Sequence, residues 1–163
     1  MYGTTNKHSI FVALQTAIVM KLLLDPKEMT DCFFAETRLL GIMAPIKDYL
    51  FCWHLNNRLG IDFRINNDIE IQLTKKQRNY FFAVYEFPEQ YTSVVHYLYN
   101  NQFDGEYLLP EFRHLDFIWL LKGDDMLDSG IQHLVKSIKD IRGVQLVTEL
   151  TNEKIRNKEH LVF

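Results

Sequence analysis

The chain changes character at Leu109-Pro110-Glu111-Phe112-Arg113-His114-Leu115-Asp116-Phe117, where an aromatic-rich run of predicted strands gives way to a hydrophobic strand and then a helix. Pro110 has a fixed φ and no N–H, so it can end a strand or open a turn but cannot lie in a central strand. Asp116 precedes the apolar run 117–121, which we predict to be a strand. The stretch is therefore predicted to be a connection of defined shape between two strands.

The two acids of this connection permit two interpretations. In the structural one, Glu111 accepts hydrogen bonds from free backbone N–H groups, and Asp116 does the same at the start of the next strand. In the functional one, the two side chains converge to form a paired-carboxylate site for general acid/base catalysis or for a metal. Sequence spacing alone does not decide between these interpretations.

This stretch resembles the signature of the IPExxxVDY family of uncharacterised bacterial proteins, read here as LPE, three residues, then LDF. Pro110, Glu111 and Asp116 agree with the pattern, while Leu109, Leu115 and Phe117 replace its Ile, Val and Tyr. Chemistry that needs the phenolic hydroxyl of that Tyr would be absent from this chain. The resemblance spans roughly residues 20 to 163, and its further matching positions are Lys47, Asp48, Tyr49, Cys52, Trp53 and the closing segment 157–163. The family is named for a sequence pattern, so the resemblance implies no activity.

Composition favours one folded cytoplasmic domain. The 163 residues are 47% hydrophobic and 13% aromatic, which excludes disorder and allows a sizeable core. The net charge is −3 and the basic residues are scattered, which argues against nucleic acid as a partner. Cys32 and Cys52 lack the spacing of a zinc site and are predicted to be free thiols in a reducing cytoplasm.

The N-terminal region is predicted to be separate from this domain. Its apolar run 10–20 is too short to span a bilayer, and no convincing signal-peptidase site follows, so we expect neither a membrane partner nor secretion. The resemblance begins near Met20. We therefore interpret residues 1–19 as a weakly ordered extension from a misassigned start codon, and residues 20–163 as a single α+β domain.

A helix is predicted over residues 45–59, with Pro45 at its first position, Asp48 in its first turn and Gly60 at its exit. It carries two apolar stripes: one is Ile46, Tyr49, Leu50, Trp53 and Asn57, and the other is Phe51, Cys52, Leu55 and Leu59. A helix that is apolar on two sides must be covered on two sides. It is therefore either sandwiched within the domain or shared with another subunit.

The rest of the chain reads as strands with one more main helix. A second helix is predicted over residues 126–142, with Asp124 or Asp125 as its N-cap and Gly143 at its end. Strands are predicted at 22–24, 34–43, 61–73 with a break at 66–68, 78–87, 91–100, 106–109, 117–121 and 144–150. The predicted fold is α+β, a mostly antiparallel sheet of about six or seven strands with two main helices on one face. The apolar end Leu161-Val162-Phe163 suggests docking in a groove or against a neighbour.

Few chemical motifs are present. The sequence contains no glycine-rich phosphate loop and no G-x-S-x-G, and neither a cofactor nor a metal is predicted. Cys52 could act as a nucleophile with a distant His, but a Cys on an apolar helix stripe is more often inert packing, and His54 has no His or acid at i+4 to share a metal. His96 and His114 would give the sharpest enzyme hypothesis if they met Glu111 or Asp116. The aromatic residues between 80 and 99 could stack bases on a sheet, but without basic companions we interpret them as core or interface.

Two classes of function remain open. The first is a non-catalytic interaction or assembly protein, either a homo-oligomer or the partner of another protein, because the apolar residues outnumber what two helices can cover. The alternative is an enzyme or a domain binding a small ligand or a metal, with a site around Glu111, His114 and Asp116.

Overall fold

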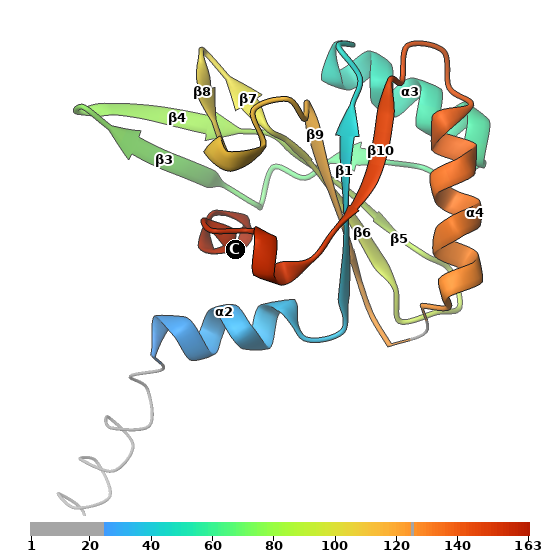
Figure 1. Cartoon of the computed structure of the whole chain (residues 1–163), viewed down its shortest axis with the longest axis horizontal. Helices are drawn as coiled ribbons and strands as arrows, with labels where there is room; N and C mark the ends of the chain where they lie inside the picture. The colour runs from blue at the N-terminus through green and yellow to red at the C-terminus, as the bar shows by residue number, and fades with distance from the viewer. Residues whose placement is uncertain (1–24, 125) are drawn as a thin grey trace, which may run out of the picture. The chain divides into compact units, whose positions relative to one another are not determined.

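The computed structural model describes residues 25–124 and 126–163. The chain divides into two units between residues 33 and 34. Helix α2 (Pro26–Phe34) makes up nearly all of the described part of the first unit, and its last residue, Phe34, is the first residue of the second unit. Figure 1 shows the elements of each unit. The interpretations of residues 1–19, of a start at Met20 and of a strand at 22–24 lie outside the described residues.

The second unit is built on a six-stranded sheet in the order β10-β1-β9-β6-β5-β2. The strands are β1 (Thr37–Met43), β2 (Arg64–Ile65), β5 (Val84–Pro88), β6 (Val95–Asn100), β9 (Phe117–Lys122) and β10 (Leu146–Leu150). All five neighbouring pairs are antiparallel. β9, whose sequence is FIWLLK, lies in the interior of the sheet with five of its six residues buried. The predicted α+β fold with an antiparallel sheet is confirmed.

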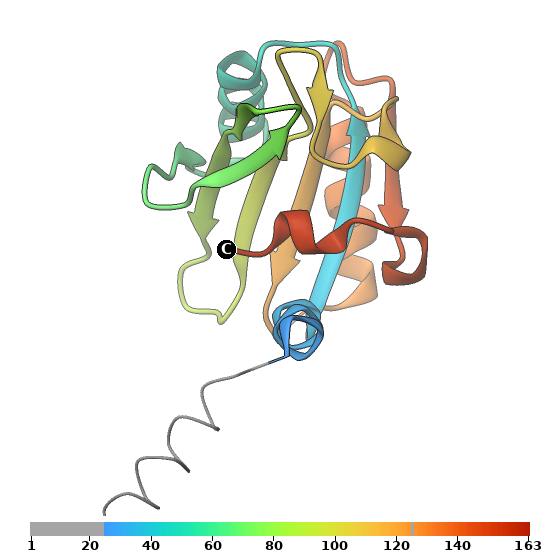
Figure 2. The same ribbon diagram turned by 90° about the vertical axis from the view of Figure 1, so that its left-hand side faces the viewer.

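Helices α3 (Asp48–Leu59) and α4 (Asp128–Lys139) cover one face of the sheet, as predicted (Figures 1 and 2). Alternate residues of the strands point toward them, because successive side chains of a strand face opposite sides. The resulting core includes Phe51 and Leu55 of α3, Ile131 and Ile138 of α4, and Trp119 of β9. The rings of Phe51 and Phe117 stack with their centroids 4.5 Å apart.

The opposite face of the sheet is covered by irregular segments and short helical turns. These are η1 (Pro110–Phe112), η2 (Asn152–Lys154) and η3 (Lys158–Leu161), and Figure 2 shows η3 lying across the sheet. Two hairpins complete the unit: β3 (Ile71–Lys75) with β4 (Arg78–Phe82), and β7 (Gln102–Phe103) with β8 (Glu106–Tyr107). Leu161 is buried and its carbonyl accepts a hydrogen bond from the hydroxyl of Tyr99 at 2.9 Å. The apolar C-terminus therefore docks on the chain's own sheet.

Several predicted boundaries were wrong for local reasons. Pro45 is not the first helical residue: α3 begins at Asp48, because Lys47 has a non-helical ψ of 138° and occupies the N-cap position. The first strand begins at Thr37 rather than at residue 34, because α2 continues to Phe34 and Glu36 adopts a left-handed φ of 54°. Gly60 has the left-handed φ of 66° expected at a helix exit.

The predicted strand 78–87 is two strands that belong to different sheets. β4 ends at Phe82 and pairs with β3 through a turn in which Lys76 and Gln77 both have positive φ, while β5 begins at Val84 in the central sheet. Alternation continues through Ala83, so a period of two cannot reveal a change of partner. The strand predicted from residue 91 begins at Val95, because 89–94 form a loop closed by a hydrogen bond from Glu89 N to Val94 O.

The second main helix is shorter than predicted. α4 spans Asp128–Lys139, and Leu127 occupies its N-cap position without a side-chain hydrogen bond. Asp124 does not cap it, because its carboxylate accepts a hydrogen bond from the Ser93 hydroxyl instead. Asp125 lies outside the described residues. Gly143 follows the helix with a φ of 96°, and the last strand begins at Leu146 rather than at 144.

Candidate functional site

The signature stretch is organised by a residue that the sequence analysis overlooked. Asn101, which is 0% exposed, accepts a hydrogen bond from Leu109 N at 2.8 Å through its side-chain oxygen. Its amide nitrogen donates to Phe112 O at 3.0 Å and to Leu115 O at 2.8 Å. Its backbone binds Leu108 and Asp116. One side chain thus fixes the path of residues 108–116.

Glu111 ties this stretch to the C-terminal segment. Its carboxylate accepts hydrogen bonds from Arg156 N at 2.7 Å, from Asn157 N at 3.0 Å and from Asn157 Nδ2 at 2.7 Å. Burial by itself would raise the pKa of Glu111, but the hydrogen bonds from Asn157 and Arg156 outweigh it and lower that pKa. The carboxylate is therefore held ionised as a clamp between two segments.

Asp116 ties the same stretch to the connection between β1 and α3. Its carboxylate accepts from Ala44 N at 2.7 Å, and its own N–H donates to Ile42 O at 2.9 Å. The carboxylates of Glu111 and Asp116 thus bind two different parts of the chain. His114 is exposed, and its ring lies edge-on to Phe112 with centroids 6.4 Å apart.

His96 has other partners than those considered from the sequence. Its Nε2 lies 2.8 Å from Glu89 Oε1, and Trp119 Nε1 donates to its Nδ1 at 3.0 Å. Both ring nitrogens are used, so neither Glu111 nor Asp116 binds this histidine. Burial of the ring lowers the pKa of His96, although Glu89 acts in the opposite sense. No sequence motif links Glu89 to His96 or to Trp119.

The two apolar stripes of α3 have different environments. Phe51, Cys52 and Leu55 are buried against the sheet. Tyr49 is 67% exposed, Leu50 40% and Trp53 58%, so the stripe that carries them faces outward. Burial, followed by the charge of Asp48, raises the pKa of Cys52 to about 12. Cys52 is therefore a protonated packing residue, and both cysteines of the described chain are free thiols.

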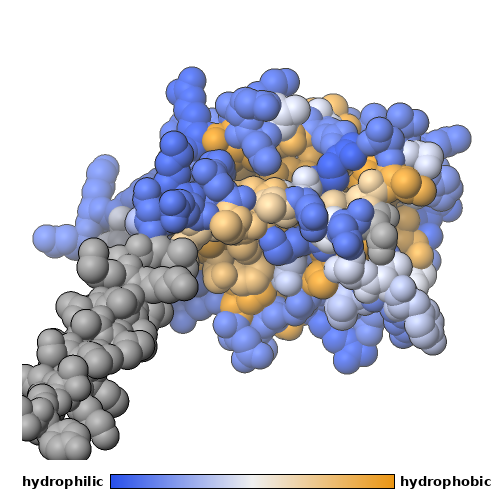
Figure 3. Space-filling view, turned by 90° about the horizontal axis from the view of Figure 1, so that it is seen from below, coloured by the Kyte–Doolittle hydropathy of each residue, from blue (hydrophilic) through white to orange (hydrophobic). Residues whose placement is uncertain are grey.

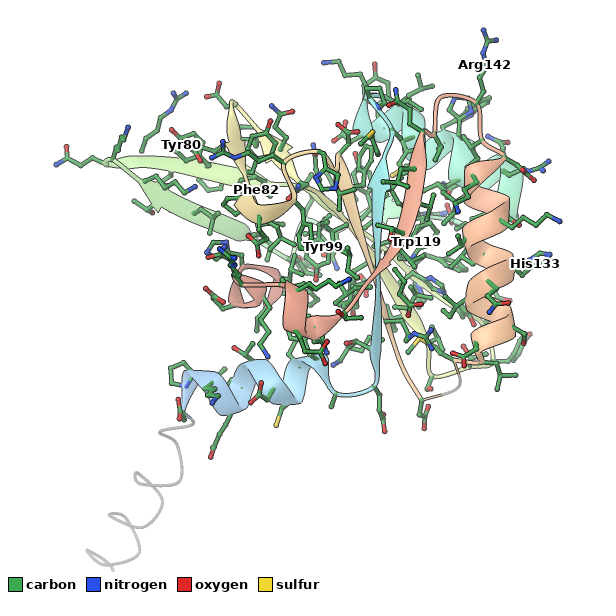
Figure 4. All side chains as sticks on the ribbon, in the orientation of Figure 1. Tyr80, Phe82, Tyr99, Trp119, His133 and Arg142 are labelled. Atoms are coloured by element: carbon green, nitrogen blue, oxygen red, sulfur yellow. The ribbon has the colours of Figure 1, made fainter. Side chains whose placement is uncertain are left out.

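The aromatic residues between 80 and 99 are divided among different surfaces. Tyr80 and Phe82 lie on the β3–β4 hairpin, and Tyr99 lies on the central sheet, as Figure 4 shows. Phe82, Tyr85 and Tyr99 are buried. A single stacking platform for bases is therefore not formed by these side chains.

A cavity of about 370 Å³ lies between α4 and the helix-covered face of the sheet. It is lined by His96, Glu89, Trp119 and mostly apolar neighbours from α3, α4 and the strands. Figure 4 shows Trp119 between the sheet and α4. Among residues 25–124 and 126–163, no group of three or more His, Cys, Asp or Glu side chains is placed to hold a metal.

Comparison with protein families and with curated proteins gave no match for this chain. In the part of the chain that the structure describes, no helix is long and apolar enough to cross a membrane.

Proposed function

We propose that this chain is a non-catalytic assembly protein of the bacterial cytoplasm, similar to the IPExxxVDY proteins, and that it self-associates through the outer face of α3. The observation that carries this proposal is the outward stripe Tyr49, Leu50 and Trp53. Tyr and Trp are the residue types most enriched at the energetic centres of protein interfaces. Large apolar side chains at successive turns of one helix present a continuous strip rather than isolated exposures.

A second copy of the chain is the partner that this strip fits best. The strip contains no charged side chain, and a two-fold interface places the same patch on both sides. At such an interface a charged residue would lie near the same charge on the other copy, whereas uncharged aromatic and aliphatic residues can pack against their own copies. Hydrophobic residues also reach the surface elsewhere, and Figure 3 shows a group of them, surrounded by hydrophilic residues, near the middle of the face it presents.

The test is the mass of the protein in solution. We expect native mass spectrometry and sedimentation equilibrium to give a dimer, and Trp53→Glu or Leu50→Glu to give a folded monomer. Tyr91→Glu is the matched control, because Tyr91 is 101% exposed and lies in the loop 89–94, outside α3. A wild-type monomer at high protein concentration, or a dimer that survives both α3 substitutions, would overturn the proposal.

The alternative, an enzyme or ligand site around Glu111, His114 and Asp116, has less support. The carboxylates of Glu111 and Asp116 each accept hydrogen bonds from backbone N–H groups. Among the hydrogen bonds of the described residues, none joins His114 to either carboxylate. A general acid or base must be able to reach a substrate proton. Glu111 and Asp116 are better placed as structural clamps.

A further inference from the structure

The cavity beneath α4 has the size and lining of a small-molecule site. Its volume of about 370 Å³ falls in the range of roughly 300–1,000 Å³ typical of such sites. Its walls include Leu59, Ile61, Phe87, Trp119, Ile131 and Leu134. The polar residues of the lining are Arg58, Glu89, His96, His133 and Ser137, and the others are apolar or glycine, as is usual in a ligand pocket.

The charges in the cavity do not balance. Arg58 and Glu89 are the lining residues with a permanent charge. Arg58 is paired with Asp140 at 3.2 Å, so its charge is already compensated. Glu89 is bound to His96 and to the Thr92 hydroxyl, and its compensation therefore depends on the state of the histidine.

The contact with Trp119 makes His96 neutral. An indole N–H can only donate, so the Nδ1 of His96 that it binds at 3.0 Å must be an unprotonated acceptor. The single ring proton is then on Nε2, where it is donated to Glu89. A neutral donor leaves the carboxylate with its full negative charge. Two accepted hydrogen bonds also leave it acceptor capacity, since a carboxylate has about four acceptor positions.

We propose that this cavity binds a small organic cation, an amine with an aromatic or aliphatic body, whose ammonium group pairs with Glu89. The apolar body replaces water against Leu134 and Ile131, and the aromatic residues Phe87 and Trp119 line the same cavity. Charge-assisted hydrogen bonds to Glu89 supply the selection for an amine over a neutral molecule of the same shape.

The probes are 2-phenylethylamine, 2-phenylethanol and phenylacetate, which share a body and differ in head-group charge. Binding is followed by the NMR signal of the indole N–H of Trp119, a residue that lines the cavity, while the exposed Trp53 indole serves as an internal control. A Trp53→Phe variant assigns the two signals. We expect saturable shifts of the Trp119 signal by the amine, with an affinity about tenfold or more above those of the alcohol and the carboxylate.

Two variants locate the site. Glu89→Gln keeps an acceptor for His96 but removes the charge, so the preference for the amine over the alcohol should disappear. Leu134→Phe fills the cavity and should weaken the amine and the alcohol alike. Glu153→Gln, an exposed acid on η2, should change neither. If Glu89→Gln does not fold, the comparison of the three probes and the Leu134→Phe variant still decide.

Equal affinity for the amine and the alcohol would overturn the proposal, as would a preference for phenylacetate. The absence of any saturable shift at Trp119 would overturn it as well. An amine preference that persists in folded Glu89→Gln would also reject Glu89 as the recognition group.

Discussion

The two faces of the central sheet are built by different means. On the face covered by the signature stretch and the C-terminal segment, side-chain hydrogen bonds from Asn101, Glu111 and Asp116 connect segments that are distant in sequence. On the face covered by α3 and α4, apolar packing dominates, and it leaves a cavity with a neutral histidine beside a carboxylate. The carboxylates of the recognisable motif are therefore bound to backbone groups, and the cavity proposed to bind an amine lies away from them. Asp116 and Phe117 also line a separate pocket of about 440 Å³ together with Lys47 and Asp48.

The largest expected effect is on the face covered by the signature stretch. Asn101→Ala leaves Leu109 N, Phe112 O and Leu115 O without their partner in a buried site. Each unsatisfied buried group costs roughly 1–3 kcal/mol, so we expect a loss of about 3 kcal/mol or more in the free energy of unfolding. Urea denaturation measures it. Asn67→Ala, in an exposed turn, is the control and should change stability little; a loss below about 1 kcal/mol at Asn101 would contradict this account of the loop.

Replacing one glycine on each side by alanine adds the same methyl group and so compares how tightly the two sides are packed. A Cβ at Gly41 would overlap Leu115 Cδ1, and Leu115 is buried, so Gly41→Ala should cost about 1–3 kcal/mol. A Cβ at Gly130 of α4 meets nothing within 4 Å, so Gly130→Ala should stabilise the helix by about 0.5–1 kcal/mol. Thermal unfolding of both variants measures these changes. Equal signs for the two substitutions would remove the distinction between a tightly packed face and an open one.

Glu111 tests whether the face covered by the signature stretch depends on charge. Glu111→Gln keeps one oxygen acceptor but removes the negatively charged carboxylate. We expect it to lower the free energy of unfolding by about 1–2 kcal/mol at neutral pH. Because the folded-state pKa lies below the ordinary value of 4.5, this stabilisation is present above pH 4.5 and is lost as the pH falls through the folded pKa. Urea titrations at several pH values should therefore show the difference between wild type and variant shrinking in acid.

The control for this experiment is Glu153→Gln on η2, which should show no such convergence. A constant gap across the acid range would mean that the hydrogen bonds of Glu111 stabilise the fold without its charge.

The sequence was sufficient for the parts of the fold that repeat regularly. The apolar run 117–121 and the period of 3.6 after residue 127 gave a central strand and a helix, and the antiparallel α+β arrangement followed from the order of such segments. Boundaries failed where the local backbone departs from the repeating pattern. Pro45 would suit the first position of a helix, but Lys47 has a ψ of 138° and the helix starts after it.

The side-chain contacts that distinguish the two faces of the sheet could not be predicted from such repeating patterns. Asn101 is one polar residue after a strand, and only its burial beneath three backbone groups reveals its role. Glu89 and His96 are separated by a loop whose closure brings them together. For α3 the sequence correctly gave two apolar stripes, but two stripes of similar character do not indicate which one meets the sheet.

The smallest expected effect is a pH dependence on the cavity face. His96 has a folded-state pKa below its ordinary value of 6.5, so the unfolded chain binds a proton more readily than the folded one. Stability from this group is therefore present above pH 6.5 and is lost as the pH falls from there toward the folded pKa, with a slope of at most about 1.4 kcal/mol per pH unit for one proton. Burial lowers the pKa of His96 more than Glu89 raises it, which sets the sign. Protonation would also place an N–H of His96 against the Trp119 indole N–H. His96→Gln should remove this part of the slope in unfolding measured between pH 7 and pH 5, whereas His114→Gln, at an exposed position, should retain it. An unchanged slope in His96→Gln would mean that the ring can accept a proton in the folded state, and Glu89 would then no longer be the uncompensated charge that distinguishes this face.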